Sequence, residues 1–396
     1  MMLRLLLVLL MTMTLSPGLV SADDSLLRHV VIRSTLGNCR QQFTKEKQGH
    51  VAFLGGSITE MNGYRPMVAA DLQKRFPETE FTFTNAGIAS TCSSTGAFRV
   101  SEDVLVQGPV DLLFVEFAVN DDQDAHHSLE ASRRGMEGIV RQTLQHNPRA
   151  DIVMTYFVNP EMLEQTQQGK TPVPVQAHNQ VAEHYGLNTI VLTEELANQI
   201  QEGTITWEKY GGTHPAPAGN AIPAAMINAM FDQIANDLDA APSQRASKLP
   251  EPLDPLCYDR GRFLAKDAVS LSPGWSHEIP DWKSIPGSFR NRFGEQPLYV
   301  TTMPGAKLTV NFEGQAFGVY VLAGPDAGTL ACQLDGGAAK TIDLYHHYSQ
   351  GLHYPRTVMF FTDLPSGRHT ATIWLAEPTT STRPANAARI LQFVAN

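Results

Sequence analysis

Four short blocks of the sequence carry groups that could act together on an ester carbonyl. Ser57 follows two glycines at the end of an apolar run, where its hydroxyl could serve as a nucleophile. Gly87 ends the sequence NAG, and Asn120 follows the apolar run 110–119. Attack of a hydroxyl on a carbonyl produces an oxyanion, which fixed N–H donors stabilise. His214, followed by a proline, is a candidate base that could take the serine proton and return it to the leaving group.

The elements that must position these groups are predicted by alternating apolar runs and helical patterns. Strands are expected at 50–54, 81–84, 110–119, 151–158 and 188–192, and helices at 64–76, 129–146, 175–185 and 218–238. This alternation predicts an α/β fold with a parallel sheet covered on both faces. The carboxyl ends of neighbouring parallel strands open onto one crevice, so we expect Ser57, Gly87 and Asn120 to meet there.

In their order and composition the four blocks resemble the SGNH (GDSL-type) hydrolase superfamily, over roughly residues 50–231. The matching blocks are Gly55-Gly56-Ser57-Ile58-Thr59, Asn85-Ala86-Gly87, Val119-Asn120-Asp121 and Gly211-Gly212-Thr213-His214-Pro215. The resemblance implies a flavodoxin-like α/β hydrolase domain whose reaction requires no metal ion or organic cofactor. It also implies Ser57 as the nucleophile and His214 as the general base and acid. The oxyanion hole would consist of the N–H groups of Ser57 and Gly87 and the side chain of Asn120.

The sequence departs from the family pattern at two glycines. Gly56 stands where many members have aspartate, and Gly211 stands where an aspartate usually orients the histidine. Three alternatives remain open: a Ser-His dyad, a histidine held by a backbone carbonyl or by Glu208, or an inactive descendant. We expect an active enzyme, because the oxyanion hole and the base still contribute without the third member.

The second half of the chain has a different period. Residues 240–255 lose both patterns and are predicted to be a linker between a hydrolase domain at 23–239 and a second domain at 256–396. In the second domain apolar and polar residues alternate, which predicts an antiparallel, jelly-roll-like β-sandwich. Similar sandwiches accompany secreted esterases that act on carbohydrates. Five aromatic residues could face sugar rings or belong to the core: Trp275, Trp282, Tyr345, Tyr348 and Tyr354.

The N-terminus and the composition bear on location and partners. Residues 1–22 have the basic start, short apolar run and small-residue end of a signal peptide cleaved near Ala22, which predicts a secreted or periplasmic protein. We expect no membrane span after it. A formal net charge of −10 argues against nucleic acid or an anionic membrane surface as partner. The oligomeric state is left open.

Cysteine, histidine and carboxylate residues suggest further sites. Cys39, Cys92, Cys257 and Cys332 could form disulfides in three pairings or remain unpaired. The segment 121–127, with three aspartates and two histidines, is interpreted as a solvated loop rather than a metal site. The spacing of three further histidines (His346, His347 and His353) matches no standard zinc site. A carboxylate in an apolar strand, Glu116, could be paired or could form a polar floor.

Taken with the resemblance, these features predict a secreted serine esterase that removes O-acetyl groups from a polysaccharide or oligosaccharide through an acyl-serine intermediate. An alternative is a catalytically degenerate carbohydrate-binding protein, motivated by Gly211. A second alternative is a lipid or thioester hydrolase of the same fold, which needs an apolar acyl cleft. The sequence leaves the polymer and the acetyl position open.

Overall fold

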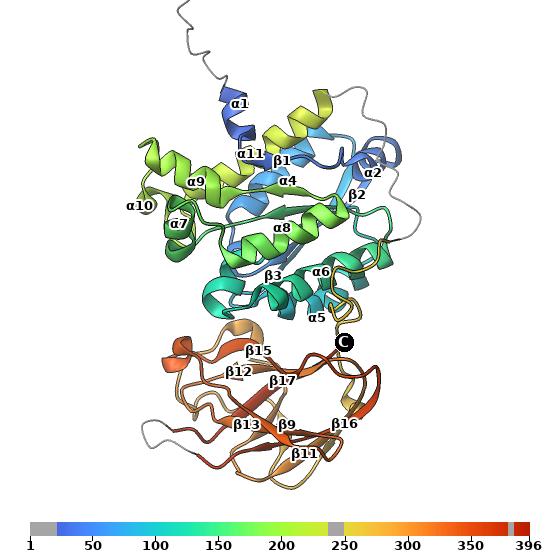
Figure 1. Cartoon of the computed structure of the whole chain (residues 1–396), viewed down its shortest axis with the longest axis vertical. Coiled ribbons are helices and arrows are strands. Elements are labelled where there is room, and N and C mark those ends of the chain that lie inside the picture. The colour runs from blue at the N-terminus through green and yellow to red at the C-terminus, as the bar shows by residue number, and fades with distance from the viewer. Residues whose placement is uncertain (1–21, 237–248, 379–383) are drawn as a thin grey trace, which may run out of the picture.

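The computed structural model describes residues 22–236, 249–378 and 384–396, which form two domains (Figure 1). The N-terminal domain is built on a six-stranded sheet with the order β1-β6-β5-β4-β2-β3. All neighbouring strands are parallel except β1, which runs antiparallel to β6. The strands are β1 (Val30–Val31), β2 (Gln48–Gly55), β3 (Glu80–Gly87), β4 (Leu112–Glu116), β5 (Asp151–Thr155) and β6 (Asn188–Ile190).

Among the parallel strands the order is flavodoxin-like, because β2 lies between β3 and β4 and the later strands follow outward on one side. The connections after β2 and β4 therefore leave the sheet in opposite directions and open a crevice at the carboxyl ends of these strands. The predicted α/β fold class is confirmed, and this crevice is where Ser57 and Asn120 lie.

Helices cover both faces of this sheet (Figure 1). α5, α6 and α8 pack together on the face nearer the second domain, and α4 and α11 pack on the other. The longer helices are α4 (Tyr64–Arg75), α5 (Ser93–Asp103), α6 (Leu129–His146), α7 (Pro160–Gln167), α8 (Val173–Tyr185), α9 (Leu192–Gln201) and α11 (Pro217–Asn236). The shorter elements are α1 (Ala22–Leu27), α2 (Gly37–Gln41), η1 (Gln42–Glu46), α3 (Ser57–Glu60), η2 (Leu105–Gln107), η3 (Asn120–Asp124) and α10 (Trp207–Tyr210).

The predicted elements recur with shifted ends, and two differences concern the site. The strand expected at 110–119 ends at Glu116, because the chain turns there into the helical segment η3. Helix α5 was not predicted, because its first turn consists of serine, threonine and glycine, which are poor helix formers. All of its residues from Ser93 to Val100 are buried, so tertiary packing stabilises it.

The C-terminal domain is an antiparallel β-sandwich, as predicted. One sheet has the order β15-β12-β17-β10-β9, with β7 also pairing with β17, and the other has the order β14-β13-β16-β11-β8. Apolar residues on alternate positions of β11 and β12, among them Leu308, Val310 and Val319, form the core between the sheets.

The strands of the sandwich are β7 (Arg262–Phe263), β8 (Val269–Leu271), β9 (Ser276–Glu278), β10 (Leu298–Thr301), β11 (Lys307–Gly314), β12 (Phe317–Ala323), β13 (Thr329–Leu334), β14 (Ala339–Asp343), β15 (Tyr354–Phe361), β16 (Gly367–Leu375) and β17 (Ala388–Ala395). Three short 3₁₀ turns complete the domain: η4 (Lys266–Ala268), η5 (Asn291–Phe293) and η6 (His347–Gln350).

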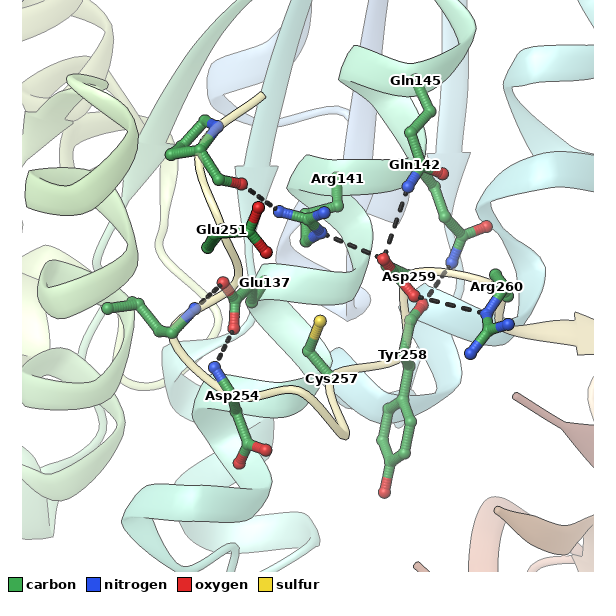
Figure 2. Close-up of polar contacts among 12 residues, drawn as sticks. Glu137, Arg141, Gln142, Gln145, Glu251, Asp254, Cys257, Tyr258, Asp259 and Arg260 are labelled. Carbon is green, nitrogen blue, oxygen red and sulfur yellow. Dashed lines mark hydrogen bonds and ion pairs between the residues drawn. The ribbon is translucent and has the colours of Figure 1, made fainter. Parts of the chain in front are cut away.

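The segment that leads into the sandwich is fixed along α6 (Figure 2). The carboxylate of Glu137 accepts hydrogen bonds from the backbone N–H groups of Leu253 at 2.6 Å and Asp254 at 3.1 Å. Gln142 donates to the carbonyl of Tyr258 at 2.7 Å. The segment that precedes the sandwich is therefore held on the N-terminal domain. Residues 240–248 of the predicted linker lie outside the described residues.

Two further predictions concern cysteines and membranes. Each of the four cysteines is buried, and none forms a disulfide in the described residues. Of the alternatives left open by the sequence, the structure shows unpaired cysteines. In the part of the chain that the structure describes, no helix has the length and apolar character to span a bilayer. The predicted signal peptide lies outside the described residues except for Ala22, which begins α1.

Candidate active site

The serine and histidine predicted from the sequence meet at the carboxyl end of the sheet. Ser57 is the first residue of α3, directly after β2, and His214 lies on the loop between α10 and α11. The Oγ atom of Ser57 lies 2.8 Å from Nε2 of His214, which is hydrogen-bond distance for proton transfer from the hydroxyl to the imidazole. Ser57 is half-buried and His214 is exposed, so the pair is open to a substrate.

The predicted oxyanion donors surround this serine. The N–H of Ser57 belongs to the first turn of α3, where N–H groups have no acceptor within the helix. Asn120 is buried and donates through Nδ2 to Oδ2 of Asp124 at 2.5 Å, which leaves its second amide hydrogen available. The N–H of Gly87 donates to Oδ1 of Asn85 at 3.0 Å, so an oxyanion at this position would share or replace that bond.

Two glycines allow these groups to approach each other. A Cβ atom on Gly56 would lie 2.0 Å from Oδ1 of Asn120, so a side chain here would push the asparagine away. A Cβ atom on Gly87 would lie 2.2 Å from the backbone nitrogen of Glu60, at the end of α3. An aspartate at this position, which many SGNH hydrolases carry, would therefore require the Asn120 side chain to move.

Glu116, at the end of β4, forms hydrogen bonds with the residues on both sides of Ser57. Its Oε1 atom accepts hydrogen bonds from the N–H of Gly56 at 3.0 Å and from the hydroxyl of Thr59 at 2.7 Å. The side chain is buried, and burial raises its pKa to about 7 against the lowering effect of these hydrogen bonds. Of the two roles considered for this residue, the structure shows the polar floor.

Arg99 of α5 connects the ends of β2 and β3, and sequence reasoning missed it. It is buried and donates to the carbonyl of Gly55 at 2.9 Å and to that of Ala86 at 2.7 Å, while Asp103 neutralises its charge. These carbonyls lie just before the Gly56-Ser57 turn and just before Gly87. An arginine between Phe98 and Val100 was the available signal, because a charged residue in an apolar run is buried only with partners.

The loop that carries His214 is shaped by backbone contacts. Gly211 has φ +105°, and a Cβ atom there would lie 2.0 Å from the nitrogen of Ala216, so the usual aspartate cannot occupy this position. The N–H of Ala216 donates to the carbonyl of Tyr210 at 2.8 Å and closes the loop. Asn220, also missed by sequence reasoning, donates to the carbonyl of Pro215 at 2.5 Å.

No carboxylate orients His214 among the described residues, where the only hydrogen bond of its side chain is with Ser57. Glu208, considered as a substitute, is exposed, and its pKa is lowered by hydrogen bonds with its own backbone N–H and with Thr206. The described geometry is thus that of a Ser-His dyad.

The β-sandwich borders the active site. Arg292, beside β10, donates to Oε1 of Glu60 at 3.0 Å and to the carbonyl of Gly87 at 3.1 Å. His346 reaches the other side and contacts the carbonyl of Asp124 through Nε2 at 2.9 Å. Both sides of the oxyanion region therefore touch the second domain.

The five aromatic residues that could face sugars or belong to the core differ in exposure. Trp275 is buried and donates to the carbonyl of Ala306, and Tyr354 is buried and stacks on His346, so both belong to the interior. Trp282 is partly buried and stacks on Phe289. Tyr345 is partly buried against the sandwich core. Tyr348 is 44% exposed and is the one of the five that offers a ring at the surface.

Comparison with known proteins gives a family match for the N-terminal domain and a fold match for both domains. Residues 53–222 match the GDSL-like Lipase/Acylhydrolase family. Two solved structures of a two-domain esterase, CEX, active on acetylated mannans, have TM-scores of 0.76 and 0.74 at 20% identity. Each alignment covers 94% of this chain. It covers 98% of the first structure's chain and 97% of the chain of the second, which was co-crystallised with mannopentaose. At this identity the likeness shows the two-domain fold. A search of curated proteins finds no significant match.

Proposed function

We propose that this chain, a carboxylic ester hydrolase by its match to the GDSL-like family, removes O-acetyl groups from a polysaccharide or oligosaccharide. The observation that carries the proposal is the 2.8 Å contact between Ser57 Oγ and His214 Nε2 at the crevice where Gly87 and Asn120 also end. The resemblance to an esterase active on acetylated mannans favours a mannan-type substrate.

The reaction begins when Ser57 attacks the acetyl carbonyl and His214 takes its proton. Negative charge then develops on the carbonyl oxygen, which the N–H groups of Ser57 and Gly87 and the free amide hydrogen of Asn120 stabilise. His214 returns the proton to the sugar hydroxyl, which leaves, and an acetyl-serine remains. Water, deprotonated by His214, attacks the acetyl-serine and releases acetate. No step needs a metal ion or organic cofactor.

A dyad is sufficient because the histidine is positioned by its loop. The closed backbone between Tyr210 and Ala216 fixes the path of the chain, and Asn220 holds the residue after His214. A missing carboxylate weakens stabilisation of the imidazolium but leaves the base and the oxyanion hole in place.

A carbohydrate substrate is favoured by the position of the second domain. The sandwich supplies Arg292 and His346 to the two sides of the crevice and exposes Tyr348 beside His346, with ring centroids 5.4 Å apart. A polar rim with an exposed aromatic ring suits a sugar chain better than an acyl chain. The predicted signal peptide is consistent with a secreted enzyme that meets such polymers outside the cytoplasm.

The experiment compares acetate release from an aryl acetate and from a panel of acetylated polysaccharides, including mannan and xylan. Ser57→Ala and His214→Ala are each expected to lower kcat by a thousandfold or more, because they remove the nucleophile and the base. Ser101→Ala, on the exposed face of α5, is the matched control and should retain wild-type activity. Activity of the wild type equal to that of Ser57→Ala on every ester would contradict the proposal.

A serine-directed phosphonofluoridate separates this proposal from a degenerate binding protein. An activated Ser57 displaces fluoride from phosphorus and gains a stoichiometric mass increase that Ser57→Ala lacks. An unmodified wild type would favour the binding protein. A preference for long-chain or thioester substrates would favour the lipid or thioester hydrolase.

A further inference from the structure

A second group of reactive side chains lies behind the oxyanion region and takes no part in the proposed esterase reaction. Cys92 is the N-cap residue of α5, Asp121 lies in η3 next to Asn120, and His127 follows η3. One potential ligand atom from each residue lies within 4.8 Å of the other two. This is the one group of three such residues that meets this criterion within residues 22–236, 249–378 and 384–396.

The distance between the His127 and Asp121 ligand atoms suits a tetrahedral metal ion. Ligands at about 2.0–2.3 Å from zinc are separated by about 3.3–3.8 Å. Nδ1 of His127 is buried and lies 3.3 Å from Oδ1 of Asp121, so the two form an ion pair when the imidazole is protonated. When the imidazole is neutral with its proton on Nε2, the lone pairs of Nδ1 and of the carboxylate lie at ligand spacing.

The hydrogen bonds around the group are those that orient metal ligands. Asp121 accepts from the N–H of Ser93 at 2.8 Å, from the hydroxyl of Ser93 at 2.7 Å and from Nε2 of His178 at 3.0 Å. Nε2 of His127 lies 3.4 Å from the hydroxyl of Ser94, so an N–H on this nitrogen faces an acceptor. Partners of this kind fix the ring and the carboxylate of a metal site. Among the described residues, Oδ1 of Asp121 accepts only the N–H of Ser93, so its second lone pair is the one left for a metal ion.

Charge and chemistry favour zinc. A thiolate, a carboxylate and a neutral imidazole carry two negative charges, which a divalent cation neutralises in a buried position. Sulfur and nitrogen ligands favour zinc over magnesium or calcium. A cavity of about 290 Å³ at the domain interface is lined by Cys92 and His127, and it gives a water molecule room to serve as a fourth ligand.

From this arrangement we propose that Cys92, Asp121 and His127 form a zinc site that connects the N-terminus of α5 to the loop after Asn120. The proposal is independent of the esterase function. It revises the interpretation of residues 121–127 as a solvated loop: two of them belong to the site, and the third ligand comes from a residue about thirty positions earlier.

The experiment starts with full-length protein from which metals have been removed by a chelator. Zinc is titrated against a chromophoric competitor, and the wild type is expected to bind one equivalent per chain. Co²⁺ in place of zinc is expected to give a thiolate-to-metal charge-transfer band, which needs a coordinated cysteine. Cys92→Ala and His127→Gln are each expected to lower zinc affinity by a hundredfold or more.

Three control variants accompany these. His126→Asn changes the neighbouring exposed histidine, whose positive φ asparagine tolerates. Cys332→Ala removes a buried thiol from the sandwich, and Ser57→Ala removes the nucleophile. All three should bind zinc as the wild type does.

The proposal is overturned if the wild type binds no zinc, or if Cys92→Ala and His127→Gln bind it with undiminished affinity. Loss of binding in His126→Asn alone would also overturn it, because the ion would then lie on surface histidines. If the ligand variants do not fold, the Co²⁺ spectrum of the wild-type protein tests the proposal. Bound Co²⁺ without the charge-transfer band would refute Cys92 as a ligand.

Discussion

At the scale of single residues, the site depends on a histidine that is held by the shape of its loop. Gly211 and Gly212 both have positive φ, at +105° and +78°, but their surroundings differ. A Cβ atom on Gly211 meets the nitrogen of Ala216, whereas a Cβ atom on Gly212 meets nothing within 4 Å. The two glycines therefore form a matched pair for testing what the loop contributes.

We expect Gly212→Ala to cost about 1–2 kcal/mol through backbone strain and to leave kcat nearly unchanged. Gly211→Ala should lower kcat at least tenfold and cost more stability, because the loop must move to relieve the contact with Ala216. Steady-state kinetics and chemical denaturation of both variants check this. Equal kcat values in the two variants would contradict loop positioning.

Glu116 makes stability depend on pH. Its pKa in the folded protein is raised to about 7, above the ordinary value of 4.5, so the folded state binds its proton more tightly than the unfolded state does. The stabilisation is complete below about pH 4.5 and is lost as the pH rises through 7, by about 3 kcal/mol. Glu116→Gln should lack this component.

Urea denaturation at pH 5 and pH 8 measures the effect. The free energy of unfolding of the wild type, relative to Glu116→Gln, should be smaller at pH 8 than at pH 5. The same difference at both pH values would show that Glu116 does not titrate in this range.

At the scale of elements, α5 positions the ends of two strands through Arg99. Arg99→Lys should destabilise the fold by about 3 kcal/mol and lower kcat, because one ammonium cannot reproduce the planar donors that reach Gly55 and Ala86. Asp103→Asn is the control, since it removes the ion pair but keeps both carbonyl contacts of Arg99; it should also cost stability, because Arg99 is buried, but should leave kcat close to the wild-type value. Thermal denaturation and steady-state kinetics compare the two variants. Equal losses of kcat would show that the ion pair, and not the carbonyl contacts of Arg99, positions the strand ends.

At the scale of the whole molecule, the sandwich contributes to the site in two separable ways. Arg292 contacts Glu60 and the carbonyl of Gly87, so Arg292→Gln should lower kcat several-fold on both an aryl acetate and an acetylated polysaccharide. Tyr348 is exposed and contacts no catalytic residue in the described structure, so Tyr348→Ala should raise KM several-fold for the polysaccharide alone. An equal effect of Tyr348→Ala on both esters would contradict a sugar-binding role.

Much of this protein follows from local sequence patterns. Apolar runs and alternation predicted the α/β domain and the sandwich, because burial of one face sets the period of a strand or helix irrespective of distant contacts. The ends of parallel strands share one edge, so the positions of Ser57, Gly87 and Asn120 after three strands predicted that they would meet. His214, 157 positions from Ser57, was chosen as the base because its block ends in proline just before a predicted helix, and the family resemblance then assigned it the same role.

Only the tertiary structure decided how these residues are supported. Arg99 lies on a helix of poor intrinsic propensity, Glu116 had two possible roles, and the partners of Arg292 are more than two hundred positions away. Cys92 and His127 likewise belong to separate segments that packing brings together. Such contacts leave no period in the sequence, because they depend on how complete elements and domains pack rather than on the spacing of neighbours along the chain.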